Sequence, residues 1–143
     1  MILEGAHLLS LDAKSRMTVP LRVRERLAVE CDSKVVLTAD YMGFLLLFPL
    51  NLWGAFYDKA VALPRGAEMA RNAILSNAES LQVDAGGRLQ ISANLRAEAG
   101  LDKDVRLAWN LSRYEIWDTA VWKSRQELAR LATPAADIES IRA

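Results

Sequence analysis

An aspartate and an arginine four positions apart occur twice in this chain, with a short turn inside each pair. Asp12 and Arg16 form the first pair, and Asp84 and Arg88 form the second. Such an aspartate can accept hydrogen bonds from turn amides or pair with the arginine, and both restrict the guanidinium before it binds anything. A guanidinium held in this way suits phosphate or guanine. The two pairs therefore predict a polyanion-binding surface more than a reaction centre.

The residues after each arginine alternate between apolar and polar. Met17 and Val19 fall on one face of a short strand, while Arg16 and Thr18 fall on the other. Because the apolar pair must face the core, we expect Arg16 to point outward. The same alternation follows Arg88.

Basic residues are concentrated in the first of these two segments. Residues 12–26 contain five basic and two acidic side chains, whereas residues 84–98 contain two of each. We therefore expect the first copy to contact nucleic acid and the second to act mainly as its structural partner. The expected nucleic-acid contacts are Lys14, Arg16, Arg22 and Arg24, and the expected turn-positioning residues are Asp12, Asp84 and Arg88.

The same residues also allow simpler interpretations. Each Asp/Arg pair could be only a salt bridge within a turn. Arg22, Arg24 and Arg26 could be an ordinary solvated helix face, and Lys14 at the turn tip could be solvated and nothing more. Arg24 is the favoured phosphate contact of the three helical arginines, because Arg96 repeats it in the second copy.

Two copies of one unit, offset by about seventy residues, carry these side chains. Each copy is predicted to contain a strand, a turn, a strand, a short helix, a hairpin and a longer helix. A unit of about seventy residues has a marginal core alone, so we expect the two units to interlock about a pseudo-two-fold axis and neither to fold by itself. The predicted divisions are a first repeat at 5–63, a connecting helix at 64–76, a second repeat at 77–131, and a C-terminal tail at 132–143 that frays or docks on a neighbour.

Turn residues and periodicity place the individual elements. Pro20 suits a first helical position, Ser92 and Asp118 suit N-caps, and Gly100 suits a helix end. The fold class that follows is mainly β with short helices, in the α+β class. Short helices are predicted at 20–27 and 92–99, strand pairs at 34–38 with 44–48 and at 105–109 with 113–117, and longer helices at 50–61 and 119–131, with a connecting helix at 67–75.

The composition restricts the possible functions. With 143 residues, 52% hydrophobic and 25% charged, the chain is typical of a folded globular protein. Eighteen basic residues balance eighteen acidic ones, so any basic footprint must be local. Cys31 and His7 are the single cysteine and histidine, which leaves no disulfide and no clustered His/Cys metal site in one chain. We expect no metal, no cofactor, no small-molecule substrate and no enzymatic activity, and we expect the four tryptophans to lie in the core or at subunit interfaces.

The chain also shows no targeting or membrane signal. Residues 1–5 lack the cationic lead and long apolar region of a secretory signal. The densest apolar stretch, residues 44–50, is far shorter than the roughly 20 residues of a membrane helix. We expect a cytoplasmic protein with no membrane partner.

Taken in order, these motifs resemble the MraZ family, whose members carry two copies of the swapped-hairpin AbrB fold of bacterial DNA-binding proteins. The similarity runs from about Gly5 to Trp122 and is most specific at residues 11–20, 46–53, 84–91 and 114–118. It implies a sequence-specific transcriptional regulator of the division and cell-wall gene cluster, acting on its own promoter among others and associated with the nucleoid. It also implies a ring-shaped homo-oligomer, such as an octamer, that binds repeated elements of double-stranded promoter DNA.

Two positions depart from the family pattern. The family usually has glycine where Ser15 stands, at a turn position that can require a positive φ, although Gly87 keeps the glycine in the second copy. A basic residue common near the family's N-terminus is replaced by Leu3 and Glu4.

A second function remains open on the sequence. One patch with three or four phosphate contacts binds weakly at physiological salt, so a DNA-binding ring would depend on several patches acting together. The alternative is a non-catalytic oligomeric protein-interaction module, antitoxin-like or scaffolding, that uses apolar surfaces in place of the basic patch.

Overall fold

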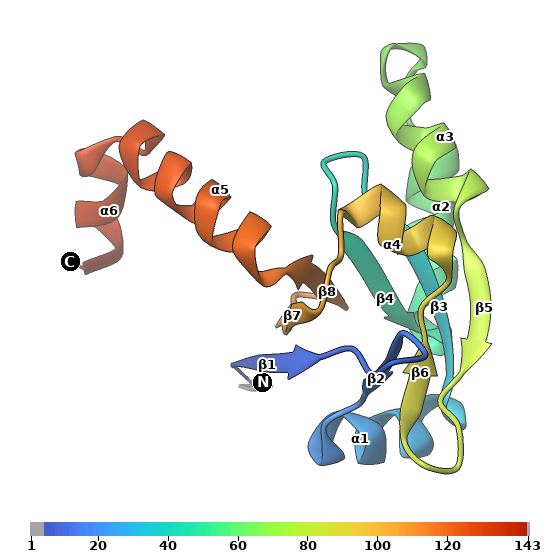
Figure 1. Ribbon diagram of the computed structural model, residues 1–143. Coiled ribbons are helices and arrows are strands. Elements are labelled where there is room, and N and C mark those ends of the chain that lie inside the picture. Colours follow the sequence, from blue (N-terminus) through green and yellow to red (C-terminus); the bar gives the residue numbers. More distant parts are fainter. Residues whose placement is uncertain (1–4, 143) are drawn as a thin grey trace.

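A computed structural model describes residues 5–142, and residues 1–4 and 143 are outside the description. Its strands form a six-stranded antiparallel sheet in the order β1-β7-β8-β4-β3-β5 and a separate two-stranded ribbon, β2-β6 (Figure 1). The strands are β1 (Ala6–Ser10), β2 (Arg16–Thr18), β3 (Lys34–Ala39), β4 (Leu45–Pro49), β5 (Glu79–Gln82), β6 (Arg88–Gln90), β7 (Asp104–Asn110) and β8 (Arg113–Asp118). The helices are α1 (Leu21–Cys31), α2 (Leu50–Val61), α3 (Glu68–Ser76) after the 3-10 turn η1 (Arg65–Ala67), α4 (Ala93–Ala99), α5 (Thr119–Ala132) and α6 (Ala135–Arg142).

The two repeats exchange strands. β1 of the first repeat pairs with β7 of the second, and β5 of the second pairs with β3 of the first. The β2-β6 ribbon takes one strand from each repeat. Because each hairpin is extended by a strand of the other copy, the two halves form one sheet system. The predicted α+β fold of two interlocked repeats is confirmed, but it is not mainly β with short helices, because helix residues outnumber strand residues within residues 5–142.

The core lies between the ribbon, the short helices and the inner face of the sheet. Period-two alternation places Met17 and Leu89 inward from the ribbon, where both are fully buried. The helices α1 and α4 close this core with one apolar side each. The fully buried side chains around it include Val19, Val23, Leu27, Leu37, Leu45, Leu47, Ile91, Leu95, Leu107 and Tyr114.

Most predicted helix ends are confirmed. The hydroxyl of Ser92 accepts a hydrogen bond from Leu95 N, and the carboxylate of Asp118 accepts one from Val121 N, so both residues are N-caps. Gly100 ends α4 in the left-handed conformation. Pro20 differs slightly, because it is the N-cap of α1 and the helix begins at the next residue.

The helix α1 is longer than the predicted 20–27 and continues to Cys31. Its end has no glycine. Asp32 and Ser33 adopt φ values of 54° and 60° in its place, and Ser33 N donates a hydrogen bond to Leu27 O. Aspartate tolerates this left-handed conformation better than most residues. No glycine therefore marks this helix end in the sequence.

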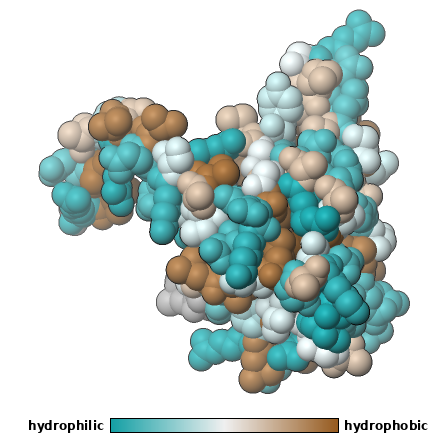
Figure 2. All heavy atoms as spheres, in the orientation of Figure 1, coloured by the Kyte–Doolittle hydropathy of each residue, from teal (hydrophilic) through white to brown (hydrophobic). Residues whose placement is uncertain are grey.

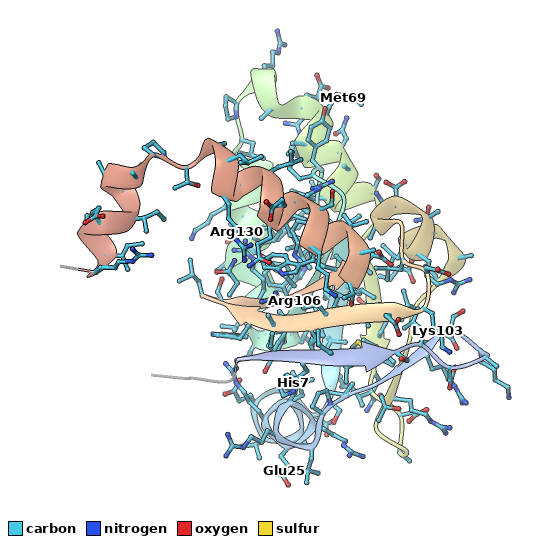
Figure 3. The ribbon with its side chains drawn as sticks, turned by 60° about the vertical axis from the view of Figure 1, so that its left-hand side comes forward. His7, Glu25, Met69, Lys103, Arg106 and Arg130 are labelled. Carbon is cyan, nitrogen blue, oxygen red and sulfur yellow. The ribbon has the colours of Figure 1, made fainter. Side chains whose placement is uncertain are left out.

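The two longer helices are used differently in the two repeats. The helix α2 packs on the sheet through Phe48, Trp53 and Phe56, whose ring centroids lie 4.4–5.7 Å apart. The helix α5 contacts the sheet near its start, where Trp122 packs edge-on against Trp117 and under the Arg106 guanidinium. Figure 3 shows Arg106 between β7 and α5. These contacts support the prediction that tryptophans serve packing.

Arg125, one turn later, still donates a hydrogen bond to Met42 O in the β3–β4 turn. Beyond Arg125, α5 and α6 extend from the body (Figure 1), and we call these two helices the C-terminal arm. The predicted tail is thus mostly helical. Apolar residues gather on the arm (Figure 2). Its exposed large apolar side chains are Leu128, Leu131, Ile138 and Ile141.

The predictions about membrane and targeting segments can be compared with the structure only within residues 5–142. In residues 5–142, every helix is too short or too polar to cross a membrane. The replaced basic residue at positions 3 and 4, and most of the segment examined for a secretory signal, lie outside the described residues.

Candidate nucleic-acid interface

The β2-β6 ribbon brings the two turn arginines onto one surface. Its antiparallel register places Arg16 opposite Gln90 and Thr18 opposite Arg88, with Met17 opposite Leu89 between them. Since the central pair is buried, the other four side chains lie on the outward face. Main-chain hydrogen bonds that flank the ribbon, Val19 N to Gly87 O and Ile91 N to Ser15 O, join each strand to the turn of the other copy.

The first turn holds its arginine closely. Asp12 Oδ1 accepts hydrogen bonds from Lys14 N and Arg16 N, both at 2.9 Å, and Asp12 Oδ2 accepts one from Arg16 Nε at 2.8 Å. The backbone N–H of Arg16, aided by its guanidinium and by the Lys14 N–H, lowers the pKa of Asp12. The Arg16 side chain keeps 24% of its surface exposed, so it is oriented yet accessible.

The second turn holds its arginine more loosely. Asp84 Oδ1 accepts a hydrogen bond from Arg88 N at 2.8 Å, but Asp84 Oδ2 and Arg88 Nε are 3.5 Å apart. The Arg88 N–H is the main cause of the lowered pKa of Asp84, and the charge of Arg16 also contributes. The effect of Arg16 on Asp84 shows that the two turns are electrostatic neighbours.

Arg24 crosses from the first repeat to the turn of the second. A Cβ atom built on Gly87 would lie only 2.1 Å from Arg24 Nη1, so the guanidinium occupies the space that a side chain at Gly87 would need. Among the described residues, no carboxylate lies within salt-bridge distance of Arg24. Its charge is therefore not neutralised by an ion pair in the described part of the chain.

The other basic residues of the first repeat are in different surroundings. Lys14 is exposed at the turn tip, and Arg22 is exposed on α1. Arg26 packs into the molecule, with its guanidinium 3.9 Å from the Trp109 ring centroid and its Nη1 donating to Tyr114 Oη at 3.2 Å. Arg26 thus connects the two repeats, and the basic surface at the ribbon is smaller than the count of basic residues indicates.

Gln90 and Arg88 belong to the outward face, although the sequence predicted no contact for Gln90 and only turn positioning for Arg88. Gln90 Nε2 donates to Lys14 O at 2.8 Å, which ties the second strand to the first turn. Alternation after Arg88 already placed Gln90 on its outward side. The missing information was the pairing of β2 with β6, which no local pattern encodes.

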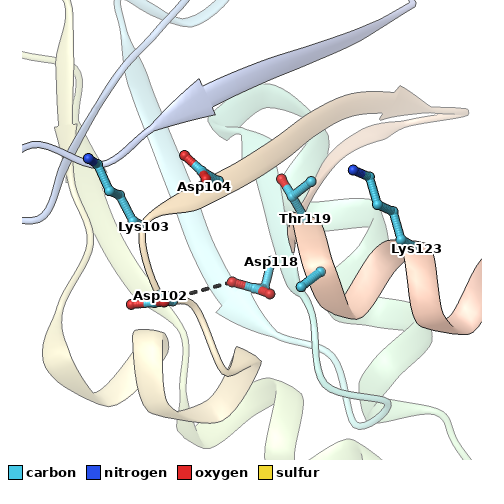
Figure 4. A pocket seen from close by; sticks show the side chains of 7 residues that line it. Asp102, Lys103, Asp104, Asp118, Thr119 and Lys123 are labelled. Carbon is cyan, nitrogen blue, oxygen red and sulfur yellow. Dashed lines mark hydrogen bonds between the residues drawn. The ribbon is translucent and has the colours of Figure 1, made fainter.

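A separate hollow of about 280 Å³ lies beside the start of α5 (Figure 4). Three aspartates line it, and one of them, Asp118, accepts hydrogen bonds from Asp102 N at 3.0 Å and from Val121 N at 3.2 Å. Within the part of the chain that the structure describes, no group of three or more His, Cys, Asp or Glu residues could hold a metal ion. Asp118 therefore caps α5, and a second aspartate of the lining, Asp104, accepts a hydrogen bond from Ser10 Oγ at 2.9 Å.

The exchanged strands and the arginine-bearing ribbon define a duplicated α+β domain of two interlocked repeats. The sequence profile of the family described as "MraZ protein, putative antitoxin-like" matches the chain twice, at residues 2–73 and 74–138. The chain belongs to this family. It is 40% identical over 126 residues to proteins from Burkholderia cenocepacia, Burkholderia lata and Cupriavidus pinatubonensis, each named Transcriptional regulator MraZ, with 88% of this chain and 89% of each relative covered.

Proposed function

We propose that this protein is a DNA-binding transcriptional regulator that contacts double-stranded promoter DNA through the outward face of the β2-β6 ribbon. The observation that carries the proposal is the placement of both turn arginines, one from each repeat, on that single face. The name of the relatives supports a regulatory role and describes no enzyme.

The local charge of the ribbon favours a polyanion although the whole chain is neutral. Lys14, Arg16, Arg24 and Arg88 lie at the ribbon or its turns, against the carboxylates of Asp12 and Asp84, which leaves a net charge of +2 from these six groups. With so few groups to neutralise phosphates, the affinity of one ribbon for DNA is low at physiological salt and falls steeply as the salt concentration rises.

The shape of the ribbon suits the major groove, which admits a two-stranded β-ribbon. Arg16 uses Nε to bind Asp12, so its terminal N–H groups remain to make bidentate contacts with guanine or phosphate. The looser Arg88 faces the same side. Lys14 and Arg24, with Arg22 further along α1, would contact the flanking backbone.

Self-association would supply the affinity that one ribbon lacks. The C-terminal arm exposes Leu128 at 63%, Leu131 at 79% and Ile141 at 81%, which supports its use as a contact with another copy. A ring, such as an octamer, would hold several ribbons on one DNA at high effective concentration. The promoter of the division and cell-wall cluster is the proposed target, and binding to it would associate the protein with the nucleoid.

The exposed arm also favours a second candidate, a protein-interaction module that is antitoxin-like or a scaffold. This function needs the apolar arm but not the ribbon. Ionic strength separates the two candidates, because only DNA binding loses affinity steeply with salt.

The test is fluorescence anisotropy with the DNA upstream of the protein's own gene, over a range of salt concentrations. We expect Arg16→Ala to abolish specific binding without changing the oligomer measured by native mass spectrometry. The matched control is Arg65→Ala, since η1 lies at the far end of the molecule from the ribbon (Figure 1). Wild-type affinity in the Arg16 variant, or an equal loss in both variants, contradicts the assignment.

A further inference from the structure

The two turns differ at the position of Gly87 and Ser15, because Gly87 of the second turn has no Cβ and Ser15 of the first turn has one. An arginine of α1, Arg24, lies where a Cβ of Gly87 would be. In the second turn, Gly87 has φ +77°, and the Arg24 side chain fills the space above its Cα. A Cβ there would lie 2.1 Å from Nη1, 2.5 Å from Cζ and 2.8 Å from Cδ of Arg24. The close approach is possible only because Gly87 has no side chain.

The equivalent position in the first turn is Ser15, and the equivalent of Arg24 is Arg96. Ser15 adopts the same left-handed conformation, with φ 60°, but it carries a side chain. The Arg96 guanidinium donates its hydrogen bond to Ile91 O in its own repeat. The two repeats therefore place equivalent arginines differently, and position 15 carries a Cβ where position 87 has none.

We propose that Gly87 is a positioning residue that seats Arg24 at the edge of the DNA-binding ribbon, and that Ser15 excludes Arg96 from the matching seat. This inference rests on the proposed function. It makes the ribbon of each chain unequal at its two ends, with one helical arginine available to phosphate and the other held by Ile91 O.

Displacing Arg24 should disturb the fold little. The atoms that a Cβ on Gly87 would meet run from Cδ to Nη1 of the half-buried Arg24 side chain. Its buried Nε has no hydrogen-bond partner within the described residues, so no hydrogen bond at Nε is lost when the side chain moves. The remaining effect of Gly87→Ala is backbone strain at a positive φ, and the natural Ser15 shows that this turn accepts a residue with a Cβ. The substitution is therefore expected to move the cation and keep the turn.

The experiment measures affinity for promoter DNA by fluorescence anisotropy as a function of salt. Each phosphate contact multiplies the DNA-binding constant by roughly the molar salt concentration raised to the power −0.9, which is about fivefold at 150 mM salt. We expect Gly87→Ala and Arg24→Ala each to lose about fivefold per engaged ribbon and to lower the salt slope by about 0.9. The double variant should lose no more than either single variant, because both remove the same contact.

The control for backbone strain is Gly100→Ala. Gly100 has φ +59°, close to that of the turn residues, and a Cβ there would meet nothing within 4 Å. We expect this variant to lose thermal stability as Gly87→Ala does, but to keep wild-type DNA affinity and salt slope. An equal loss of affinity in both glycine variants would assign the effect to strain and overturn the proposal.

Ser15→Gly tests the other half of the inference without depending on the folding of Gly87→Ala. Removing the Cβ at position 15 should let Arg96 occupy the space beside the first turn. The affinity for promoter DNA should then rise about fivefold per ribbon, and the salt slope should rise by about 0.9. An unchanged slope overturns the role of Ser15. If wild type binds DNA but Gly87→Ala matches it, the positioning of Arg24 is wrong, whereas absence of salt-dependent binding by wild type contradicts the proposed function itself.

Discussion

Leu89→Ala is expected to be among the most destabilising single changes in the ribbon. Leu89 has no exposed surface and lies opposite Met17, which is equally buried. Leucine-to-alanine changes at buried sites lower the free energy of unfolding by about 2–5 kcal/mol, and complete burial at a junction of two repeats favours the upper part of that range. For a domain of this size, each kcal/mol lowers Tm by about 2–4 °C or somewhat more. We therefore expect a loss of about 3–5 kcal/mol and a Tm at least about 6 °C lower.

The assay is chemical and thermal unfolding followed by circular dichroism, at matched protein concentration. Val29→Ala is the control, because this valine is 88% exposed on α1, away from the C-terminal arm, and the change should alter the unfolding free energy of the body by less than about 0.5 kcal/mol. Met17→Ala should resemble Leu89→Ala, and the double variant should depart from additivity because the two side chains share one cavity. A loss below about 1 kcal/mol for Leu89→Ala would show that the ribbon does not hold the repeats together.

Three further predictions follow from the same contacts. The pKa of Asp12 in the folded protein lies below the ordinary value of about 3.9, so its contribution to stability is present above about pH 3.9 and is lost as pH falls through the folded pKa. An NMR titration of the Asp12 carboxyl carbon should give a midpoint below about 3.9, and a midpoint at or above that value would contradict the turn geometry. Residues 1–64 should not fold alone, because β3 loses β5 and β1 loses β7, so a cooperative melting transition of that fragment would count against strand exchange. Leu131→Glu on the arm should lower the oligomer mass seen by native mass spectrometry and leave the Tm of the body unchanged. The control Val29→Glu, at a residue 88% exposed on α1, should change neither quantity. An unchanged oligomer mass in the Leu131 variant would mean that the arm is not part of the subunit interface.

Local patterns could predict those parts of the fold that depend on neighbours in sequence. Ser92 and Asp118 were predictable as caps because a hydroxyl or carboxylate reaches backbone N–H groups within the same turn. The direction of Arg16 followed from alternation alone. The end of α1 was not predictable from glycine, since Asp32 and Ser33 take the left-handed conformation there.

The composite nature of the candidate site depended on contacts between residues far apart in the chain. The seat of Arg24 is made by Gly87, sixty-three positions later, and Arg26 is withdrawn from the surface by Trp109. Neither contact leaves a periodic signal, because each joins a helix of one repeat to a turn or strand of the other. The number of basic residues in the first copy therefore overestimates its exposed charge, because Arg26 is packed against Trp109. The contact between Gln90 and Lys14 O was not predictable for the same reason, since it joins the two repeats.

The unequal ends of the ribbon give the proposed regulator a direction on DNA. If Arg24 contacts phosphate at one end and Arg96 stays on Ile91 O at the other, a single chain should bind its element in one orientation. Rotational symmetry in a ring carries every ribbon in the same sense, so a series of direct repeats matches it and inverted repeats do not. We expect reversal of one element in a promoter with several repeats to remove most of the gain from multivalent binding, measured by gel shift at fixed salt. Equal affinity for direct and inverted arrangements would mean that the ribbon behaves as a symmetric reader, and that the Gly87 and Ser15 difference has no effect on recognition.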